Sequence, residues 1–201
     1  MSGSIKTSDS QKSSNSSSRL LLVPREFYNN PLEHVFLKLD GFTVAESCTQ
    51  TAEKSGTMYH EEHTLICILR GNFEVSFEST RLNLEKGEML LLKKGTIVNY
   101  TKSGDSEDGN TFEIMMFFIA GTFLSQFKQR YAAVLPKIEN MMPVTVKPIN
   151  ERMSGFISSL KPLLSEKSKI DSELIKLKFF ELLYGLGNLD QDLLIQLLQT
   201  E

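Results

Sequence analysis

The sequence predicts an α+β protein in which a small antiparallel β-barrel is followed by a helical segment. Apolar residues recur with a period of two from about residue 35 to residue 119, which is typical of strands with one buried face. Glycine-containing turns interrupt this region at short intervals, as in a sandwich or barrel. After residue 119 the apolar period changes to 3.6, which indicates helices. We therefore expect a tail at residues 1–18, a barrel at 19–120 and a helical segment at 121–201.

The composition is that of a globular protein, and we expect it in the cytoplasm. Of 201 residues, 40% are hydrophobic, which suffices for one substantial core. Residues 1–18 are polar and Ser-rich, so they predict a disordered tail rather than a secretory signal. No apolar run approaches the ~20 residues of a membrane helix, so we expect no membrane partner. Cys48 and Cys67 are too few for a disulfide framework and are expected to be buried thiols.

The charge balance argues against direct binding of nucleic acid. The formal net charge is −3, and no basic stretch stands out. Proteins that grip DNA or RNA usually present a basic face, because neutralising phosphates supplies much of the affinity.

The barrel region is built from short strands joined by tight turns. Phe73, Val75 and Phe77 alternate with polar neighbours, so this strand has one wet face. The runs 89–92 and 114–119 are apolar on both faces and should be covered on both sides. Turn positions where a positive φ is expected are Gly41, Gly71, Gly87 and Gly95. Residues 102–110 should form an exposed hairpin connection.

The helical segment carries recognisable start and stop signals. Phe123, Phe127 and Tyr131 predict a short first helix. Further helices are expected to begin at the N-caps Asn150, Asp171 and Asp190. Pro162 should kink or end the second helix, and Gly185 and Gly187 should end the third.

No arrangement in the sequence supports catalysis, and we expect neither an enzyme nor a cofactor. The histidines are at positions 34, 60 and 63. Three or four ligands must converge on a metal ion, but His60 and His63 would point to opposite faces of a strand. An alternative is a small metalloenzyme in which both converge with a carboxylate of Glu61, Glu62 or Glu113.

The turn region resembles a cupin barrel. The resemblance is carried by residues 70–77 and by Gly87 and Gly95, which keep the spacing of the second cupin motif. In metal-binding cupins that motif also has a proline and a histidine, where this sequence has Lys93 and Val98. The resemblance therefore implies a cupin fold that has lost its metal ligands.

The chain resembles more closely the N-terminal domain of AraC-type regulators of bacterial transcription. The resemblance covers about residues 65–200, including the segments 121–131 and 177–183. It implies a degenerate cupin barrel followed by a helical dimerisation segment. The sequence is also similar to the subgroup that activates secretion and virulence genes.

The family's C-terminal pair of helix-turn-helix motifs is missing from this sequence. DNA would therefore be contacted only through a domain that the chain lacks. The chain is either an excised regulatory half or a natural stand-alone relative, and we favour excision because the leucine-rich end at 193–198 suggests continuation.

The resulting hypothesis is a regulatory domain that senses an effector or partner and forms a homodimer. The effector would be a small apolar molecule with an anionic group, or a regulatory protein would take its place. The alternative of a stand-alone protein-interaction module stays open. Expected ligand-binding residues are His60, His63, Ile66, Ile68, Phe73, Val75, Met89, Leu91, Lys93, Tyr100 and Phe117. Expected dimerisation residues, within 150–186, are Met153, Phe156, Ile157, Leu160, Leu164, Leu174, Leu177, Phe180 and Leu183.

Overall fold

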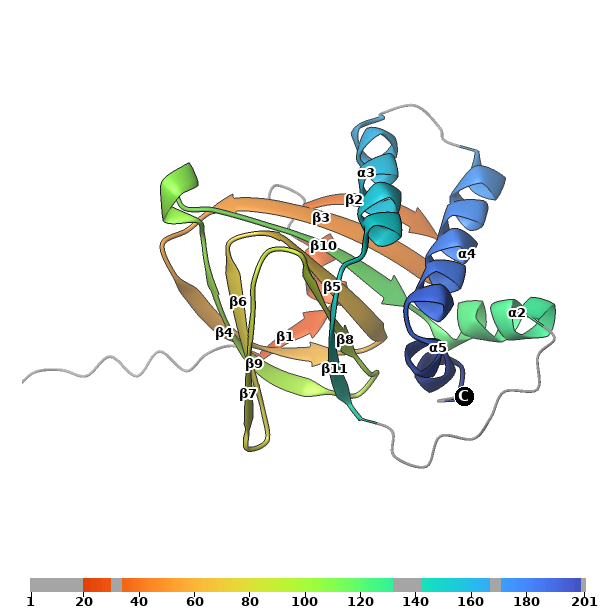
Figure 1. Ribbon diagram of the computed structural model, residues 1–201, viewed down its shortest axis with the longest axis horizontal. Helices are drawn as coiled ribbons and strands as arrows, with labels where there is room; N and C mark the ends of the chain where they lie inside the picture. Colours follow the sequence, from red (N-terminus) through yellow and green to blue (C-terminus); the bar gives the residue numbers. More distant parts are fainter. Residues whose placement is uncertain (1–19, 30–33, 132–141, 167–170, 200–201) are drawn as a thin grey trace, which may run out of the picture.

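The protein consists of two facing β-sheets with helices packed on the outer face of one of them (Figure 1). The computed structural model describes residues 20–29, 34–131, 142–166 and 171–199. The predicted disordered tail, residues 1–18, lies outside the described residues. The predicted α+β class is confirmed.

The first sheet has five strands in the order β1-β4-β9-β6-β7. Their bounds are Leu20–Val23, Lys54–His60, Ile97–Ser103, Asn72–Phe77 and Thr80–Leu84. The pairing is antiparallel except between β1 and β4, which are parallel. The short strand β1 is thus one of the two edge strands of this sheet.

The second sheet has six strands in the order β11-β8-β5-β10-β3-β2, all antiparallel. Their bounds are Val144–Pro148, Glu88–Leu92, His63–Arg70, Thr111–Ile119, Phe42–Gln50 and His34–Leu39. Strand β11 comes from the segment 121–201, the predicted helical segment. It joins the sheet because β8 offers it a free edge, and Val144 pairs with Leu92.

The described residues form five α-helices, of which three begin at the predicted N-caps. Their bounds are α1 Arg25–Tyr28, α2 Gly121–Tyr131, α3 Glu151–Ser165, α4 Ser172–Leu189 and α5 Gln191–Leu198, with a 3-10 turn at Ser106–Asp108. The three predicted N-caps are confirmed, since the side chains of Asn150, Asp171 and Asp190 each accept a backbone N–H of the first turn. None of the described helices combines the length and apolar character of a membrane span.

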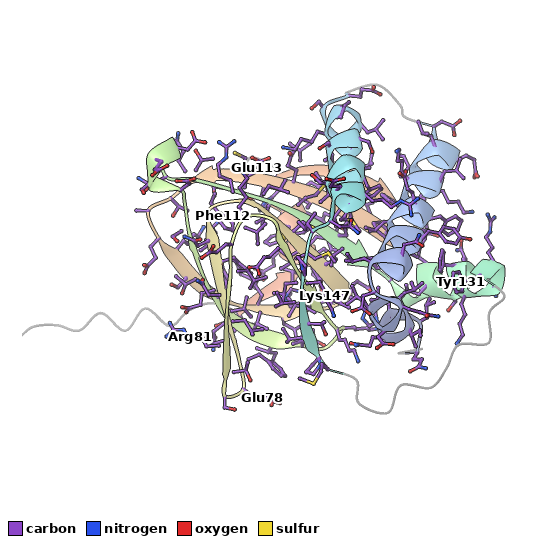
Figure 2. The ribbon with its side chains drawn as sticks, viewed as in Figure 1. Glu78, Arg81, Phe112, Glu113, Tyr131 and Lys147 are labelled. Carbon is purple, nitrogen blue, oxygen red and sulfur yellow. The ribbon has the colours of Figure 1, made fainter. Side chains whose placement is uncertain are left out.

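The prediction that Gly185 and Gly187 end the third helix is wrong. Helix α4 continues to Leu189, and Asp190 both ends it and caps α5. A Cβ atom at Gly187 would lie 2.7 Å from the side chain of Leu194. This glycine therefore permits close packing of α4 against α5 rather than a stop. Lys147 of β11 forms an ion pair with Asp190 and ties this corner to the sheet (Figure 2).

Alternating residues of the second sheet belong to two separate cores. Leu65, Cys67 and Met115 face the helices, whereas Ile66 and Ile68 face the first sheet. This arrangement confirms that the runs 89–92 and 114–119 are covered on both sides. Cys67 is buried as predicted, but Cys48 is exposed because it lies near the end of β3, beyond the helical cover.

The four predicted turn glycines all have positive φ angles, at Gly41, Gly71, Gly87 and Gly95. At position 71, glycine is required for two reasons. Its φ is +81°, and a Cβ atom would lie 2.5 Å from the carbonyl oxygen of Ser103. Glycine at this position thus allows the β9–β10 connection to approach the β5–β6 turn closely.

Candidate functional site

A cavity of about 330 Å³ lies between the two sheets at the end of the barrel near α1. This volume is within the range of small-molecule sites. Most of its wall is apolar. Its lining residues are Leu21, Glu26, Phe27, Asn29, His34, Ser47, Lys54, Met58, Ile66, Phe73, Tyr100, Lys102, Ile114 and Met116.

One wall of the cavity carries a buried hydroxyl group that the fold does not use. Ser47 is 1% exposed, and its Oγ atom has no hydrogen-bond partner among the described residues. A buried polar group usually has a partner, because leaving it without one costs free energy. Ser47 is therefore a polar group available to a molecule in the cavity.

Two lysines lie directly opposite each other at the same cavity. Lys54 of β4 and Lys102 of β9 are paired in register. The Nζ atom of Lys102 donates to Thr49 Oγ1 at 3.2 Å and lies 5.2 Å from the centre of the Phe112 ring; Figure 2 labels Phe112 on β10. Like charges directly opposite on neighbouring strands destabilise a sheet. The carboxylate of Glu26 lines the same cavity, so the charges at this end are of both signs.

Only part of the predicted ligand-binding set lines this cavity. Ile66, Phe73 and Tyr100 do. Ile68 and Val75 belong to the same inter-sheet core but lie outside the cavity lining. Met89, Leu91 and Phe117, which were predicted to bind the ligand, do not line the cavity. Their side chains face the helices on the other side of the second sheet. A shift of one residue along a strand reverses the face, and the apolar pattern of a doubly covered strand does not fix it.

The predicted polar rim also needs correction. His60 and His63 are each 1% exposed and lie outside the cavity lining. His60 Nδ1 is 2.9 Å from Thr64 Oγ1, whereas His63 Nδ1 accepts the backbone N–H of Lys94 at 3.3 Å. Lys93 lies at the turn after β8, where partial burial lowers the pKa of its ammonium group. The two histidines thus have different partners, as expected of residues that diverge.

Metal-binding side chains do not converge in the described part of the chain, where no group of three or more His, Cys, Asp or Glu could hold an ion. His60 belongs to β4 and His63 to β5. Glu113, one carboxylate of the metalloenzyme alternative, instead bonds to Lys161 of α3.

A second concave surface lies on the helical side. It is a groove of about 500 Å³ lined by Arg130, Arg152, Met153, Phe156, Leu177, Phe180, Glu181, Tyr184, Gly185 and Asn188. Leu174, Leu177 and Tyr184 of α4 are exposed by 43%, 62% and 47%. Large apolar side chains that share one exposed helix face are a common mark of an interface.

The predicted dimerisation set is corrected by the burial of its members. Met153, Phe156, Ile157, Leu160, Leu164, Phe180 and Leu183 are at most 6% exposed and pack in the core of the protomer. Ile157, Leu160, Leu164 and Leu183 could contact a second chain only if α3 and α4 unpacked, whereas Met153, Phe156 and Phe180 also line the groove. Leu174 and Leu177 alone of the set are exposed, and Tyr184 was not predicted.

Sequence reasoning missed the polar half of the cavity. Ser47, Lys54 and Lys102 come from three different strands, β3, β4 and β9. Their only common signal is the register that brings them together, and register depends on long-range pairing. The lysine pair could have been found only once β4 was placed beside β9.

Comparison with known proteins gives one family match. Residues 63–197 match the family model described as the ExsA N-terminal regulatory domain. No curated protein matches the sequence closely enough to count as a relative.

Solved structures of similar fold agree with this match. A structure of ToxT from Vibrio cholerae has a TM-score of 0.53 at 11% identity, covering 77% of this chain and 58% of ToxT. ToxT with a bound unsaturated fatty acid has a TM-score of 0.51 at 10% identity, covering 79% and 57%. The AraC-like transcriptional activator CuxR has a TM-score of 0.53 at 8% identity, covering 76% and 54%. This chain therefore spans 54–58% of the length of these three proteins.

Proposed function

The chain belongs to the ExsA N-terminal regulatory domain family and is a regulatory domain of an AraC-type transcription regulator, and from this we propose that its inter-sheet cavity binds a small effector. The effector is mainly apolar and carries one anionic group. The domain acts by binding, without catalysis, in the cytoplasm, and DNA is contacted by another part of the whole regulator.

The pairing of Lys54 with Lys102 beside an apolar cavity is the observation that carries this proposal. An apolar chain fits the wall formed by Ile66, Ile114 and Met116. A carboxylate of the effector at this end would accept charge-assisted hydrogen bonds from the two ammonium groups. The fatty acid bound to ToxT, a protein of similar fold, has this chemistry.

Oleate is a suitable probe for this cavity. We expect calorimetric titration to show binding of about one oleate per chain. Lys102→Met should weaken oleate binding about tenfold or more, because one charge-assisted contact is worth roughly 1.5–3 kcal/mol. The same substitution should change the affinity for oleyl alcohol less than twofold, since that ligand has no charge.

Lys86→Met provides the matched control, because Lys86 is an exposed lysine outside this cavity. It should bind oleate like the unmodified protein. Saturable oleate binding that is equally strong in Lys102→Met would show that the lysine pair does not recognise the carboxylate. Absence of any binding would favour a regulatory protein as the partner.

The exposed face of α4 supports a second part of the proposal, that the domain forms a homodimer. Leu174, Leu177 and Tyr184 lie on one side of this helix, beside the groove between α3 and α4. A closed two-fold pairing is the commonest way for identical chains to cover such a face.

Leu177→Lys should weaken the dimer about tenfold or more, because it places a charge in an apolar contact. Analytical ultracentrifugation over micromolar concentrations measures the dissociation constant. Ile97→Lys is the control, since Ile97 is 52% exposed on β9, away from the helices. A monomer for the unmodified domain at tens of micromolar would refute this pairing.

A further inference from the structure

Two strands connect the cavity to helix α3 through adjacent residues with opposite orientations. On β3, Ser47 lines the cavity, and its neighbour Glu46 forms an ion pair with Lys161 of α3. On β10, Ile114 lines the cavity, and its neighbour Glu113 contacts the same lysine. Successive residues of a strand point to opposite faces, so each strand presents one residue to each side.

Lys161 is the centre of this arrangement. Its Nζ atom donates to Glu113 Oε1 and lies 3.7 Å from Glu46 Oε1. The hydrogen bond to Glu113 raises the pKa of the lysine, so the group stays charged at neutral pH. Glu113 is 12% exposed and is also 4.0 Å from Arg70; it is labelled on β10 beside α3 in Figure 2. One lysine thus holds the same two strands that form a cavity wall.

The sheet is irregular at this point. The register between β5 and β10 shifts between Glu113 and Ile114, where Glu113 pairs with Arg70 but Ile114 pairs with Ile68. Such a bulge disrupts the hydrogen-bond ladder locally and re-aims side chains, and bulges are frequent beside functional sites. The point at which β10 contacts both the cavity and α3 is therefore the point where its pairing is least regular.

A gap separates α3 from the sheet beside the same ion pair. A cavity of about 260 Å³ is lined there by Ile157, Ser158 and Lys161 of α3 and by Arg70 and Glu113 of the sheet. The N-terminal half of α3 supplies Arg152, Met153 and Phe156 to the groove beside α4. A movement of α3 over this gap would therefore reshape the groove.

We infer that Lys161, through Glu46 and Glu113, couples occupation of the inter-sheet cavity to the position of α3. This inference rests on the proposed function, because it treats the cavity as the effector site and the groove as part of the pairing surface. A molecule against Ser47 and Ile114 displaces β3 and β10 relative to each other. The two carboxylates then no longer meet one ammonium group, and α3 loosens. A contiguous set of contacts with two arrangements is the physical basis of such coupling.

Amide hydrogen exchange of α3, residues 151–165, tests this coupling with two independent perturbations of the cavity. One is oleate, and the other is Ser47→Leu, which fills the cavity without any ligand. We expect either perturbation to accelerate exchange in α3 at least fivefold in the unmodified protein and in Lys161→Arg, which keeps the charge. In Lys161→Met the response should fall below twofold. Lys128→Met, an exposed lysine of α2, should respond like the unmodified protein.

The outcomes separate this inference from the effector proposal. If Ser47→Leu accelerates exchange and oleate does not bind, the coupling stands and the effector proposal fails. If oleate binds but neither perturbation changes α3, the coupling is overturned and the effector proposal stands. An undiminished response in Lys161→Met also overturns the coupling, because α3 would then sense the cavity by another route.

Discussion

Phe179→Ala is expected to lower the free energy of unfolding by about 3–5 kcal/mol, the usual cost of truncating a fully buried phenylalanine. Phe179 of α4 is 0% exposed. Its ring is stacked on Phe42 of β3, with 3.9 Å between ring centroids, and meets Phe123 of α2 edge-on at 6.2 Å. The substitution therefore opens a cavity where α2, α4 and the second sheet meet. Urea unfolding followed by circular dichroism measures the loss.

Leu177→Ala on the same helix is the matched control for this prediction. Leu177 is 62% exposed, so its truncation should change stability by less than about 0.5 kcal/mol at concentrations where the domain is monomeric. A loss of under about 1 kcal/mol in Phe179→Ala would contradict a shared core between the helices and the barrel. The helices would then be a loosely attached annex.

His60 should make the domain sensitive to acid. Burial lowers the pKa of His60 from 6.5 to about 3. Between pH 6.5 and pH 3, His60 is therefore protonated in the unfolded chain but not in the folded chain. The free energy of unfolding consequently falls as the pH drops below about 6.5. Between pH 7 and pH 5 this group alone should cost about 2 kcal/mol, at 1.36 kcal/mol per pH unit.

The chemical reason is that, within the described part of the chain, the buried ring has no acceptor for a second proton. The Thr64 hydroxyl donates to the carbonyl of Glu62, so it accepts from His60 Nδ1. The Nε2 atom is buried and has no hydrogen-bond partner among the described residues. A proton on Nε2 would thus place a charge in the core without compensation.

His60→Leu removes this titration. Its loss of stability between pH 7 and pH 5 should be smaller than that of the unmodified protein by about 2 kcal/mol, as measured by urea unfolding at both pH values. Equal losses in the two proteins would mean that His60 is accessible to protons in the folded state.

Local signals predicted the local features of this fold. The N-caps at Asn150 and Asp171 and the glycine at position 71 depend on a few neighbouring residues, and each was found from the sequence. The prediction that Gly187 ends a helix was wrong because this glycine makes room for the side chain of Leu194. That contact arises only from tertiary packing. Strand β11 was missed as part of the sheet for the same reason, since it depends on a partner more than 50 residues away.

Prediction of the candidate site required knowing which face of the sheet each strand residue points to. Strands covered on both sides, such as β8 and β10, contain continuous apolar runs at 89–92 and 114–119, so their pattern does not distinguish Met116 from Phe117. The first lines the cavity and the second packs under the helices. The predicted dimerisation residues of α3 are buried within the protomer for a similar reason, because an apolar stripe on a helix can be covered by its own sheet as well as by a second chain.

Photo-crosslinking with a fatty acid that carries a diazirine at the end of its chain tests the central claim most directly. If the inter-sheet cavity is the effector site, mass spectrometry should find the label on β5 or β10, at Ile66, Ile114 or Met116, and excess oleate should suppress it. Label confined to the α3–α4 groove, around Leu177 and Tyr184, would contradict the account, because the ligand would then occupy the helical surface and leave the barrel interior empty.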